Sequence, residues 1–253
     1  MLRDAAPDGA PCWIDLFTSD LDQSRTFYGE LFGWKSSEEA EDLGHYVNFT
    51  RDDVAVAGAM PNDGSTGAPD SWTVYLSVPD VATTTAVAVE NGGQAIVEPM
   101  PIADLGQMAV LSDAGGAVIG VWQPGTFSGF GVLNETNAPS WFELHTRDFA
   151  ETVEFYEKVF GWDVYSQGDS DEFRYSTLGE GDGQLAGVMD AKSFLPDGVP
   201  AHWAIYFGTD DADATVARTV ELGGQVLHAP EDTPYGRLAT CADVTGAMFR
   251  LLG

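Results

Sequence analysis

The chain opens with a short alternation of bulky and smaller side chains, followed by an amphipathic segment. Residues 13–18 alternate over a β-prone stretch, which predicts a strand. Asp20 then offers a helix N-cap, with Gln23 as its capping-box partner three residues later. Apolar side chains fall on one side of the positions that follow, and Gly33 stands where a left-handed residue ends a helix. We therefore expect a strand and then an amphipathic α-helix.

This pattern returns in the second half of the chain, where Asp148 with Glu151 is expected to cap the helix as Asp20 with Gln23 does, and Gly161 to end it as Gly33 does. Residues 138–146 repeat residues 10–18, and nine of the 22 positions from 13 to 34 are identical to their partners without a gap. Each repeat has about the length of a small domain, which indicates two modules rather than an array of short repeats. We place the modules at residues 1–125 and 138–253, joined by a linker at 126–137.

Strand-like runs, separated by turn residues, follow the first helix of each repeat. The strands expected in the first module are residues 45–49, 54–60, 72–78, 107–111 and 117–122, with a second helix near 81–90. Those expected in the second module are residues 173–178, 184–189, 202–207, 237–241 and 247–252. Short strands between such turns favour curved mixed sheets with helices outside.

Composition narrows the class of protein. No apolar run approaches the roughly 18–20 residues that a spanning helix needs, and the start of the chain lacks the parts of a secretory signal. We therefore expect a soluble cytoplasmic protein with no membrane partner. Cys12 and Cys241 fall in different modules, which favours buried thiols over a disulfide framework.

The chain is strongly acidic. It has 40 acidic against 11 basic residues and a formal charge of −29. Nucleic-acid binding requires clustered Lys and Arg, so DNA and RNA are not expected as partners. The acidic residues are spread along the chain, which is typical of a solvated surface; a saline habitat is the alternative interpretation.

Several motifs together carry a family resemblance. They are the Trp-x-Asp/Glu-Leu-x-Thr-x-Asp start, Phe-Tyr and Phe-Gly-Trp, the segments 56–60 and 185–189, the Gly-Gly pairs and the closing Asp-x-x-Gly-Ala. The set resembles the glyoxalase/bleomycin-resistance/extradiol-dioxygenase (vicinal oxygen chelate) superfamily. Within it, the chain is most similar to two-module actinobacterial glyoxalase-like proteins labelled hydroxylases or 27 kDa antigens. The resemblance implies an α+β fold of tandem paired βαβββ units, whose curved mixed sheets form cups with outer helices.

The resemblance also implies where a metal ion would be bound. Metal-dependent members use His, Glu or Gln side chains on three strands, which supply the oxygen and imidazole donors that divalent cations prefer. The aligned positions here hold no plausible ligand set: Trp13, Thr73, Gly120, Trp141, Ala204 and Arg250. We therefore expect neither a metal nor another cofactor. A shift of two residues on the first strand would instead place Asp15 or Glu143 there, which leaves metal-dependent lactoylglutathione lyase or dioxygenase activity open.

The inward faces of the first strands carry the main candidates for chemistry. The period of two along a strand groups them as Trp13, Asp15 and Phe17 in one module and Trp141, Glu143 and His145 in the other. An acid beside an imidazole can act as a general base, so we predict Glu143 and His145 as catalytic residues. The alternatives are that Glu143 only hydrogen-bonds to backbone or an indole, and that His145 only lines a pocket. The aromatic residues suit either core packing or a stacking wall.

Later strands add further candidates. Beside the aromatic and acidic residues of the first strands, Thr73, Tyr75, Tyr206 and Arg250 are expected to contact a ligand. Core packing is the alternative for the two tyrosines. Arg250 either binds a carboxylate or phenolate, or pairs with Glu143 or Asp15. Of the histidines, His202 is expected to face outward, and His45 and His228 to lie at the surface.

Two functions compete at this point. The first is metal-independent binding of a small aromatic or carbonyl-bearing molecule, with proton abstraction, isomerisation or hydration by Glu143 or His145 and stabilisation of negative charge by Arg250 or a tyrosine. The unequal first strands suggest that only the second module is reactive. The second function is sequestration without catalysis, as in bleomycin resistance. Because both modules lie in one chain, we expect a monomer or a homodimer.

Overall fold

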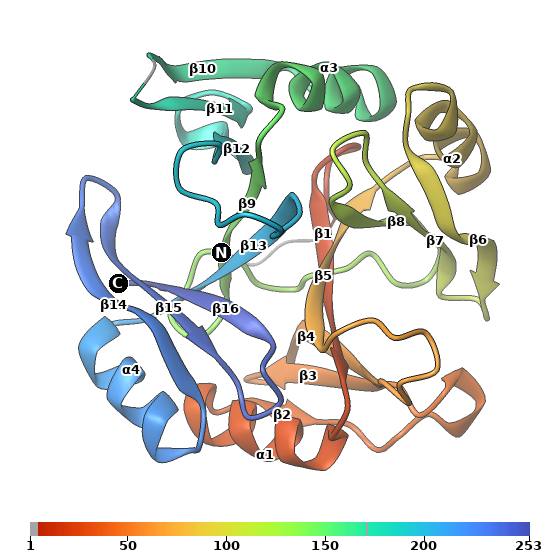
Figure 1. Ribbon diagram of the computed structural model, residues 1–253. Coiled ribbons are helices and arrows are strands. Elements are labelled where there is room, and N and C mark those ends of the chain that lie inside the picture. The colour runs from red at the N-terminus through yellow and green to blue at the C-terminus, as the bar shows by residue number, and fades with distance from the viewer. Residues whose placement is uncertain (1–4, 171) are drawn as a thin grey trace.

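A computed structural model describes residues 5–170 and 172–253 and contains two repeats of one fold (Figure 1). Module 1 contains β1 (Pro11–Thr18), α1 (Leu21–Phe32), β2 (Lys35–Ser36), a 3-10 turn (Glu41–Leu43), β3 (Val47–Arg51), β4 (Val54–Pro61), β5 (Ser71–Ser77), α2 (Val81–Glu90), β6 (Gln94–Ile102), β7 (Gly106–Ser112) and β8 (Val118–Pro124). Module 2 contains β9 (Pro139–Thr146), α3 (Phe149–Phe160), β10 (Val164–Asp169), β11 (Arg174–Leu178), a 3-10 turn (Gly181–Gly183), β12 (Ala186–Asp190), β13 (His202–Gly208), α4 (Ala212–Glu221), β14 (Gln225–Thr233), β15 (Gly236–Ala242) and β16 (Met248–Leu252).

Each module folds into one eight-stranded mixed sheet. The order is β2-β3-β4-β1-β5-β8-β7-β6 in module 1 and β10-β11-β12-β9-β13-β16-β15-β14 in module 2. In each sheet the two halves are βαβββ units that meet through the antiparallel pair β1 and β5, or β9 and β13. The expected α+β fold of tandem paired βαβββ units is therefore confirmed.

The two faces of each sheet have different surroundings. On β1, Leu16 pairs with Trp72, whose indole donates to Tyr28 on helix α1, so this face points toward the helices. Alternate residues point the other way, and Asp15 therefore shares the concave face with its partner Thr73. We call the concave faces of the sheets of modules 1 and 2 cup 1 and cup 2.

The helices pack across the boundary between the modules. In Figure 1, α1 of module 1 lies beside α4 of module 2, and α3 lies beside α2. Tyr28 of α1 donates a hydrogen bond to Asp243 of module 2 at 3.0 Å, and Tyr156 of α3 donates to Asp113 of module 1 at 3.2 Å. These matching bonds are buried, so the two modules share one core.

The first helices of the two modules start differently. Asp20 accepts a hydrogen bond from the Gln23 N–H at 2.9 Å, as predicted. Asp148 makes no such bond because its backbone, at ψ 60°, is not extended, so the corresponding cap expected from the repeat is wrong. Gly33 and Gly161 end the helices at φ 71° and 66°, as the sequence predicts.

The predicted strands and the helix at 81–90 are present, with shifts of up to two residues at strand ends. The sequence pattern misses β2, β6, β10, β14 and helix α4. The strands β6 and β14 are the outer edges of their sheets, and most of their side chains are exposed on both faces. Such strands lack the alternation that reveals a half-buried strand.

Two compositional expectations concern the membrane and the cysteines. No helix in the described parts of the chain is long and apolar enough to cross a membrane. Cys12 and Cys241 are both buried, one in each module, and no disulfide joins them. Their placement agrees with the expected buried thiols.

Candidate functional site

Cup 2 brings the predicted acid and imidazole together with a cation. Trp141, Glu143 and His145 alternate along β9 and share the concave face. Tyr206 on β13 pairs with Trp141, and Arg250 on β16 pairs with Tyr206. The central strands of the sheet therefore place these five side chains side by side.

Glu143 is the centre of a hydrogen-bond network. Its Oε1 atom lies 2.7 Å from Nε2 of His145, 2.8 Å from the Tyr206 hydroxyl and 3.7 Å from the Arg250 guanidinium. Arg250 also donates to the Tyr206 hydroxyl at 2.6 Å and approaches Nδ1 of His145 at 3.4 Å. We call these four residues the Glu143 network. Glu143 and His145 are only 7% and 2% exposed, so each needs the partners that the network supplies.

The network contains opposite charges that offset one another. Burial alone would raise the pKa of Glu143, but the hydrogen bond from His145 and the charge of Arg250 outweigh it and hold the pKa below its usual value. Burial lowers the pKa of His145, and the charge of Arg250 adds to this effect against the opposing pull of Glu143. We assign the neutral imidazole proton to Nε2, because Glu143 faces Nε2 and Arg250 faces Nδ1. The network then holds one carboxylate and one guanidinium, with no net charge.

A second tyrosine reaches the network across a glycine. Tyr175 on β11 accepts a hydrogen bond from the Trp141 indole at 2.9 Å, and its hydroxyl is a further partner of Glu143. A Cβ atom at Gly187 on β12 would lie 1.9 Å from that hydroxyl oxygen. Glycine is therefore required at this position for Tyr175 to enter the cup.

Cup 1 repeats this tyrosine and indole. Tyr46 donates to Oδ1 of Asp15 at 2.5 Å and accepts from the Trp13 indole at 2.8 Å. It crosses Gly58, where a Cβ atom would lie 1.8 Å from the Tyr46 hydroxyl. The two cups thus share a carboxyl group, a tyrosine, a tryptophan and a glycine in matching places.

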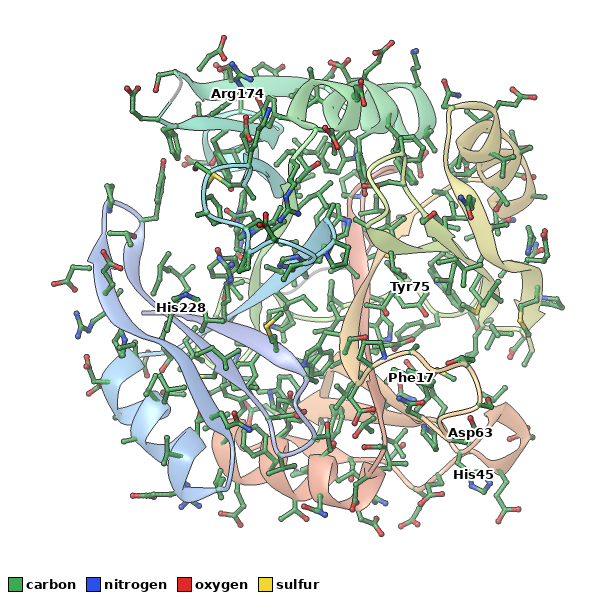
Figure 2. The ribbon with its side chains drawn as sticks, in the orientation of Figure 1. Phe17, His45, Asp63, Tyr75, Arg174 and His228 are labelled. Atoms are coloured by element: carbon green, nitrogen blue, oxygen red, sulfur yellow. The ribbon has the colours of Figure 1, made fainter. Side chains whose placement is uncertain are left out.

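Cup 1 lacks the imidazole and the cation. Phe17 stands where cup 2 has His145, and Gly120 stands beside Tyr75 where cup 2 has Arg250. Phe17 and Tyr75 are labelled in Figure 2, on β1 and β5 of module 1. Desolvation raises the pKa of Asp15 to about 6, although hydrogen bonds from tyrosines oppose the rise. Asp15 in cup 1 therefore takes up a proton at a higher pH than an ordinary aspartate, whereas cup 2 holds the oppositely charged pair of Glu143 and Arg250.

The raised pKa of Asp15 predicts how stability depends on pH. The folded-state pKa of about 6 exceeds the ordinary Asp value of 3.8, so folding favours the protonated form, and the folded state loses stability as pH rises from about 4 to above 6. We expect Asp15→Asn to stabilise the chain at pH 8 by about 1–3 kcal/mol and to give no gain near pH 4. Urea unfolding at both pH values measures this difference.

Asp63→Asn is the control for that experiment. Hydrogen bonds from Ser65 lower the pKa of the exposed Asp63 carboxyl, so its replacement is expected to give no gain at pH 8. A gain from Asp15→Asn that is equal at the two pH values would contradict the proposed cost of ionising Asp15.

The histidines partly correct the prediction from sequence. His202 faces into cup 2, not outward: it pairs with His145 across the strands, and the two rings lie 5.2 Å apart. The prediction is wrong because residues two apart on a strand share a face, and His202 is two residues from an inward position. Its Nδ1 donates to the Pro200 carbonyl at 3.1 Å. His45 and His228 are exposed, as predicted (Figure 2).

A loop at residues 191–201 forms part of the wall of cup 2. Arg147 donates to the carbonyl oxygens of Leu195 and Val199, which holds the loop against the end of β9. Phe194 from this loop lies edge-on to His145, with ring centroids 5.7 Å apart, and is 54% exposed. The Glu143 network is thus bordered by an exposed aromatic ring.

The predicted site residues fall into two clusters. Cup 1 contains Trp13, Asp15, Phe17, Thr73 and Tyr75, and cup 2 contains Trp141, Glu143, His145, Tyr206 and Arg250. The strand periodicity used above does not place Tyr46, Tyr175 or His202 in a cup. The matching places of Tyr46 and Tyr175 in the two repeats are the signal that points to them.

The side chains at the expected metal positions do not fit a divalent ion. Across residues 5–170 and 172–253, no three His, Cys, Asp or Glu side chains are arranged to hold a metal. In cup 2, Glu143 and His145 are hydrogen-bonded to each other, and the Arg250 guanidinium lies 3.7 Å from the Glu143 carboxylate. A cation at this place would repel a metal ion.

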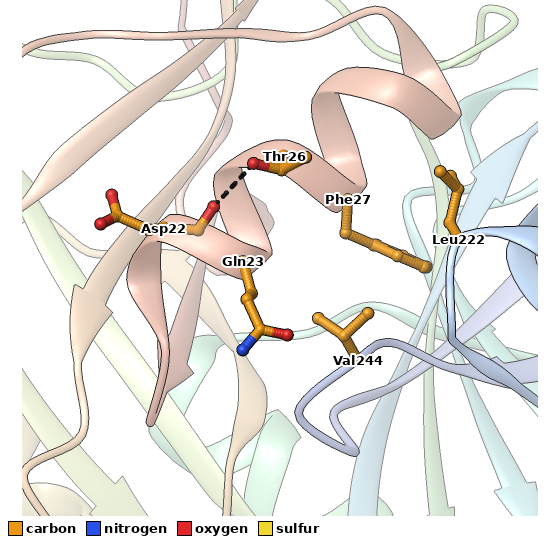
Figure 3. Close-up of a pocket in the computed structure, with 6 residues that line it drawn as sticks. All are labelled: Asp22, Gln23, Thr26, Phe27, Leu222 and Val244. Atoms are coloured by element: carbon orange, nitrogen blue, oxygen red, sulfur yellow. Dashed lines mark hydrogen bonds between the residues drawn. The ribbon is translucent and has the colours of Figure 1, made fainter.

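Two surface hollows lie away from the network. One, of about 270 Å³, is formed by Asp22, Gln23, Thr26 and Phe27 of α1 with Leu222 and Val244 of module 2 (Figure 3). The other, of about 420 Å³, is lined by Asn134, Glu135, Thr136, Ser140, Gly208, Thr209 and Leu252. Neither contains a residue of the Glu143 network. The functional groups of cup 2, and not the size of a cavity, therefore identify it as the candidate site.

Comparison with known proteins gives a family match over both modules. The model of the Glyoxalase/Bleomycin resistance protein/Dioxygenase superfamily matches residues 12–121 and 138–251. "Putative glyoxylase CFP32" of Mycobacterium tuberculosis is 36% identical over 249 residues, which cover 96% of this chain and 94% of that protein. "Anthracycline biosynthesis protein DnrV" of Streptomyces peucetius is 34% identical over 261 residues, covering 96% and 93%.

Solved structures share the fold at low sequence identity. The Mn(II)-bound glyoxalase from Novosphingobium aromaticivorans has a TM-score of 0.67 at 14% identity, covering 96% of this chain and 81% of that one. The Y257F variant of homoprotocatechuate 2,3-dioxygenase from B. fuscum has a TM-score of 0.67 at 15% identity, covering 98% and 72%. At this identity the likeness concerns the fold alone.

Proposed function

Because the chain belongs to the Glyoxalase/Bleomycin resistance protein/Dioxygenase superfamily, we propose that cup 2 binds a small aromatic or carbonyl-bearing molecule and transforms it by metal-independent acid–base chemistry. The observation that carries this proposal is the Glu143 network, in which a buried carboxylate, an imidazole, a phenol and a guanidinium meet on one concave face. The corresponding face of module 1 has no imidazole or guanidinium at the matching positions.

The roles follow from the positions of these groups. Glu143 takes a proton from a carbon next to a carbonyl group, and the electron pair of that C–H bond moves onto the carbonyl oxygen. Arg250 donates a hydrogen bond to the oxygen as it becomes negative, and Tyr206 turns its hydroxyl proton from Glu143 to this oxygen once Glu143 is protonated. His145 holds the Glu143 carboxylate through its Nε2 proton. Return of the proton to another atom completes an isomerisation, with no change in oxidation state.

The names of the relatives agree with this class of ligand. One is named as a glyoxylase and the other for anthracycline biosynthesis, and both align with nearly the whole chain. A carbonyl group is common to the molecules that these names concern. We therefore infer a ligand that combines a carbonyl oxygen with a planar or aromatic part.

The test measures proton abstraction directly. In D₂O, the unmodified protein is expected to accelerate exchange of the methyl protons of 1-phenyl-1,2-propanedione above the buffer rate, followed by ¹H NMR. Glu143→Gln is expected to lower the protein-dependent rate by at least about hundredfold, because the amide is not a base. Asp15→Asn, the matched change in cup 1, is expected to leave the rate unchanged. Full activity of Glu143→Gln would rule out Glu143 as the base.

Sequestration without turnover is the second candidate. The pKa of Glu143 is lowered, and its carboxylate accepts hydrogen bonds from Tyr206 and His145, an arrangement that also suits a binding surface. The protein would then hold the ligand without any reaction at its carbonyl group. Binding of 1-phenyl-1,2-propanedione with no exchange above the buffer rate would favour this function.

A further inference from the structure

The first part of the linker lies across cup 1. After β8, the Gly125 and Phe127 N–H groups donate to the Leu105 carbonyl at 2.8 and 3.1 Å. Further along, the Phe130 N–H donates to the Cys12 carbonyl on β1 at 2.8 Å. The segment is therefore fastened at the turn between β6 and β7 and again at the central strand of the sheet.

The ring of Phe127 occupies the aromatic part of cup 1. It meets the Trp13 ring edge-on, with centroids 4.8 Å apart and planes at 88°, and lies 6.1 Å from the Trp122 ring. The Trp122 indole also donates to the Phe127 carbonyl at 2.9 Å. With Phe130 packed at 5.5 Å on another side, Trp13 is left only 5% exposed. The Phe127 side chain thus fills the space beside Trp13 in cup 1, and backbone hydrogen bonds hold it there.

Cup 2 has the same tryptophan without an occupant ring. Trp141 lies at the position of Trp13 in the repeat and donates to Tyr175 as Trp13 donates to Tyr46. Trp141 is partly exposed, and within residues 5–170 and 172–253 no ring pair at Trp141 matches the pairs of Trp13 with Phe127 and Phe130. At the strand position of Trp122, cup 2 has Leu252. Cup 2 therefore repeats the tryptophan of this aromatic site, and within the described residues no aromatic ring takes the place that Phe127 has in cup 1.

We propose that Trp141 is the stacking site for a planar aromatic ring of the ligand, in the place that Phe127 takes in cup 1. This inference rests on the proposed function, because it assumes that cup 2 is the ligand-binding cup. Tyr206 and Arg250 lie in the same row of the sheet as Trp141, so a hydroxyl or carbonyl oxygen on the ring meets the Glu143 network. The ligand class is a neutral oxygen-bearing aromatic molecule, because the charges of Glu143 and Arg250 offset and a chain of charge −29 repels anions.

The first test compares 2-naphthol with trans-2-decalol, its saturated counterpart, by titration calorimetry. The unmodified protein is expected to bind one equivalent of 2-naphthol and to bind trans-2-decalol about tenfold more weakly, because only a flat ring stacks. Trp141→Leu is expected to weaken 2-naphthol binding by about tenfold, and Trp141→Phe to retain most of the affinity. Unchanged affinity in Trp141→Leu, or no binding to the unmodified protein, would overturn the proposal.

The second test opens cup 1. Phe127→Ala is expected to raise the stoichiometry of 2-naphthol from one to two per chain, and adding Trp13→Leu is expected to return it to one. If Phe127→Ala does not fold, Phe127→Val serves instead, because it removes the aromatic ring but keeps part of the apolar contact. A folded variant that still binds one equivalent would show that Phe127 does not mark a ligand site.

These results separate the inference from the proposed function. Loss of 2-naphthol affinity in Trp141→Leu, together with full exchange activity of Glu143→Gln, would keep the stacking site and reject the acid–base role. Loss of exchange activity in Glu143→Gln with unchanged 2-naphthol affinity in Trp141→Leu would do the reverse.

Discussion

Replacing Arg250 by methionine is expected to destabilise the folded chain by about 2–4 kcal/mol at pH 8, because it leaves a buried carboxylate without its cation. The guanidinium lies 3.7 Å from the Glu143 carboxylate, and the side chains of Arg250 and Glu143 are 24% and 9% exposed. Methionine keeps the apolar stem of Arg250, so most of the loss comes from charge rather than packing. Urea unfolding of the variant and the parent measures the difference.

The sign of the pH dependence identifies Glu143 as the cause. In the parent chain the pKa of Glu143 is lowered, so its contribution to stability is present above the unfolded-state pKa and is lost as pH falls through the folded-state pKa. Without Arg250 we expect the pKa of Glu143 to rise, which adds a cost that grows with pH. The difference in stability between parent and variant is therefore expected to narrow from pH 8 to pH 5.

Two further variants control this experiment. Glu143→Gln combined with Arg250→Met removes both charges and is expected to recover most of the lost stability, so the double-mutant cycle isolates the pair. Arg174→Met removes an arginine of an exposed ion pair with Asp169 and is expected to cost less than about 1 kcal/mol (Figure 2). Equal losses from Arg250→Met and Arg174→Met would show that burial adds nothing to the Glu143 pair.

The repeat explains why the fold is readable from sequence. Two copies of one strand and helix pattern fix the modules, and the caps at Asp20, Gly33 and Gly161 act within a few residues of the chain. The packing of α1 against module 2 depends on contacts such as Tyr28 with Asp243, which lie far apart in sequence. No local pattern specifies such a contact, so the shared core emerges only from the structure.

The candidate site is readable in part for the same reason. Glu143 and His145 lie two residues apart on one strand, so periodicity alone predicts their contact. Tyr175 enters the cup from another strand only because Gly187 leaves space, and Phe127 fills cup 1 from a linker with no periodic pattern. These placements depend on tertiary packing, which the sequence pattern does not encode locally.

The metal positions illustrate a further limit. Residue types at aligned positions predict the absence of a ligand set, but they do not reveal what takes its place. In cup 2, Arg250 sits at one of those positions and forms a network with Glu143 and Tyr206. The Arg250 guanidinium lies where it can contact a ligand oxygen. We expect its positive charge to stabilise negative charge on that oxygen, as a metal ion does in metal-dependent members of the family.

Replacing Asp243 by alanine is expected to destabilise the chain by about 3–5 kcal/mol and to weaken the contact between the modules. Oδ1 of Asp243 accepts hydrogen bonds from the N–H groups of Thr245 and Ala247 at 2.9 and 3.0 Å, and Oδ2 accepts from Tyr28 at 3.0 Å. Asp243 is 1% exposed, so alanine leaves these donors without an acceptor in a place that water does not reach. Urea unfolding measures the loss.

Tyr28→Phe separates the two roles of this carboxylate. It removes only the bond between the modules and is expected to cost about 1–3 kcal/mol, because the Trp72 indole also loses its acceptor. The turn at Asp243 stays intact in Tyr28→Phe, so hydrogen exchange is expected to rise in α1 but not at Ala247, whereas Asp243→Ala raises it at both. Unchanged exchange in α1 for Asp243→Ala would mean that Tyr28 does not join the modules, and that their shared apolar core alone holds them together.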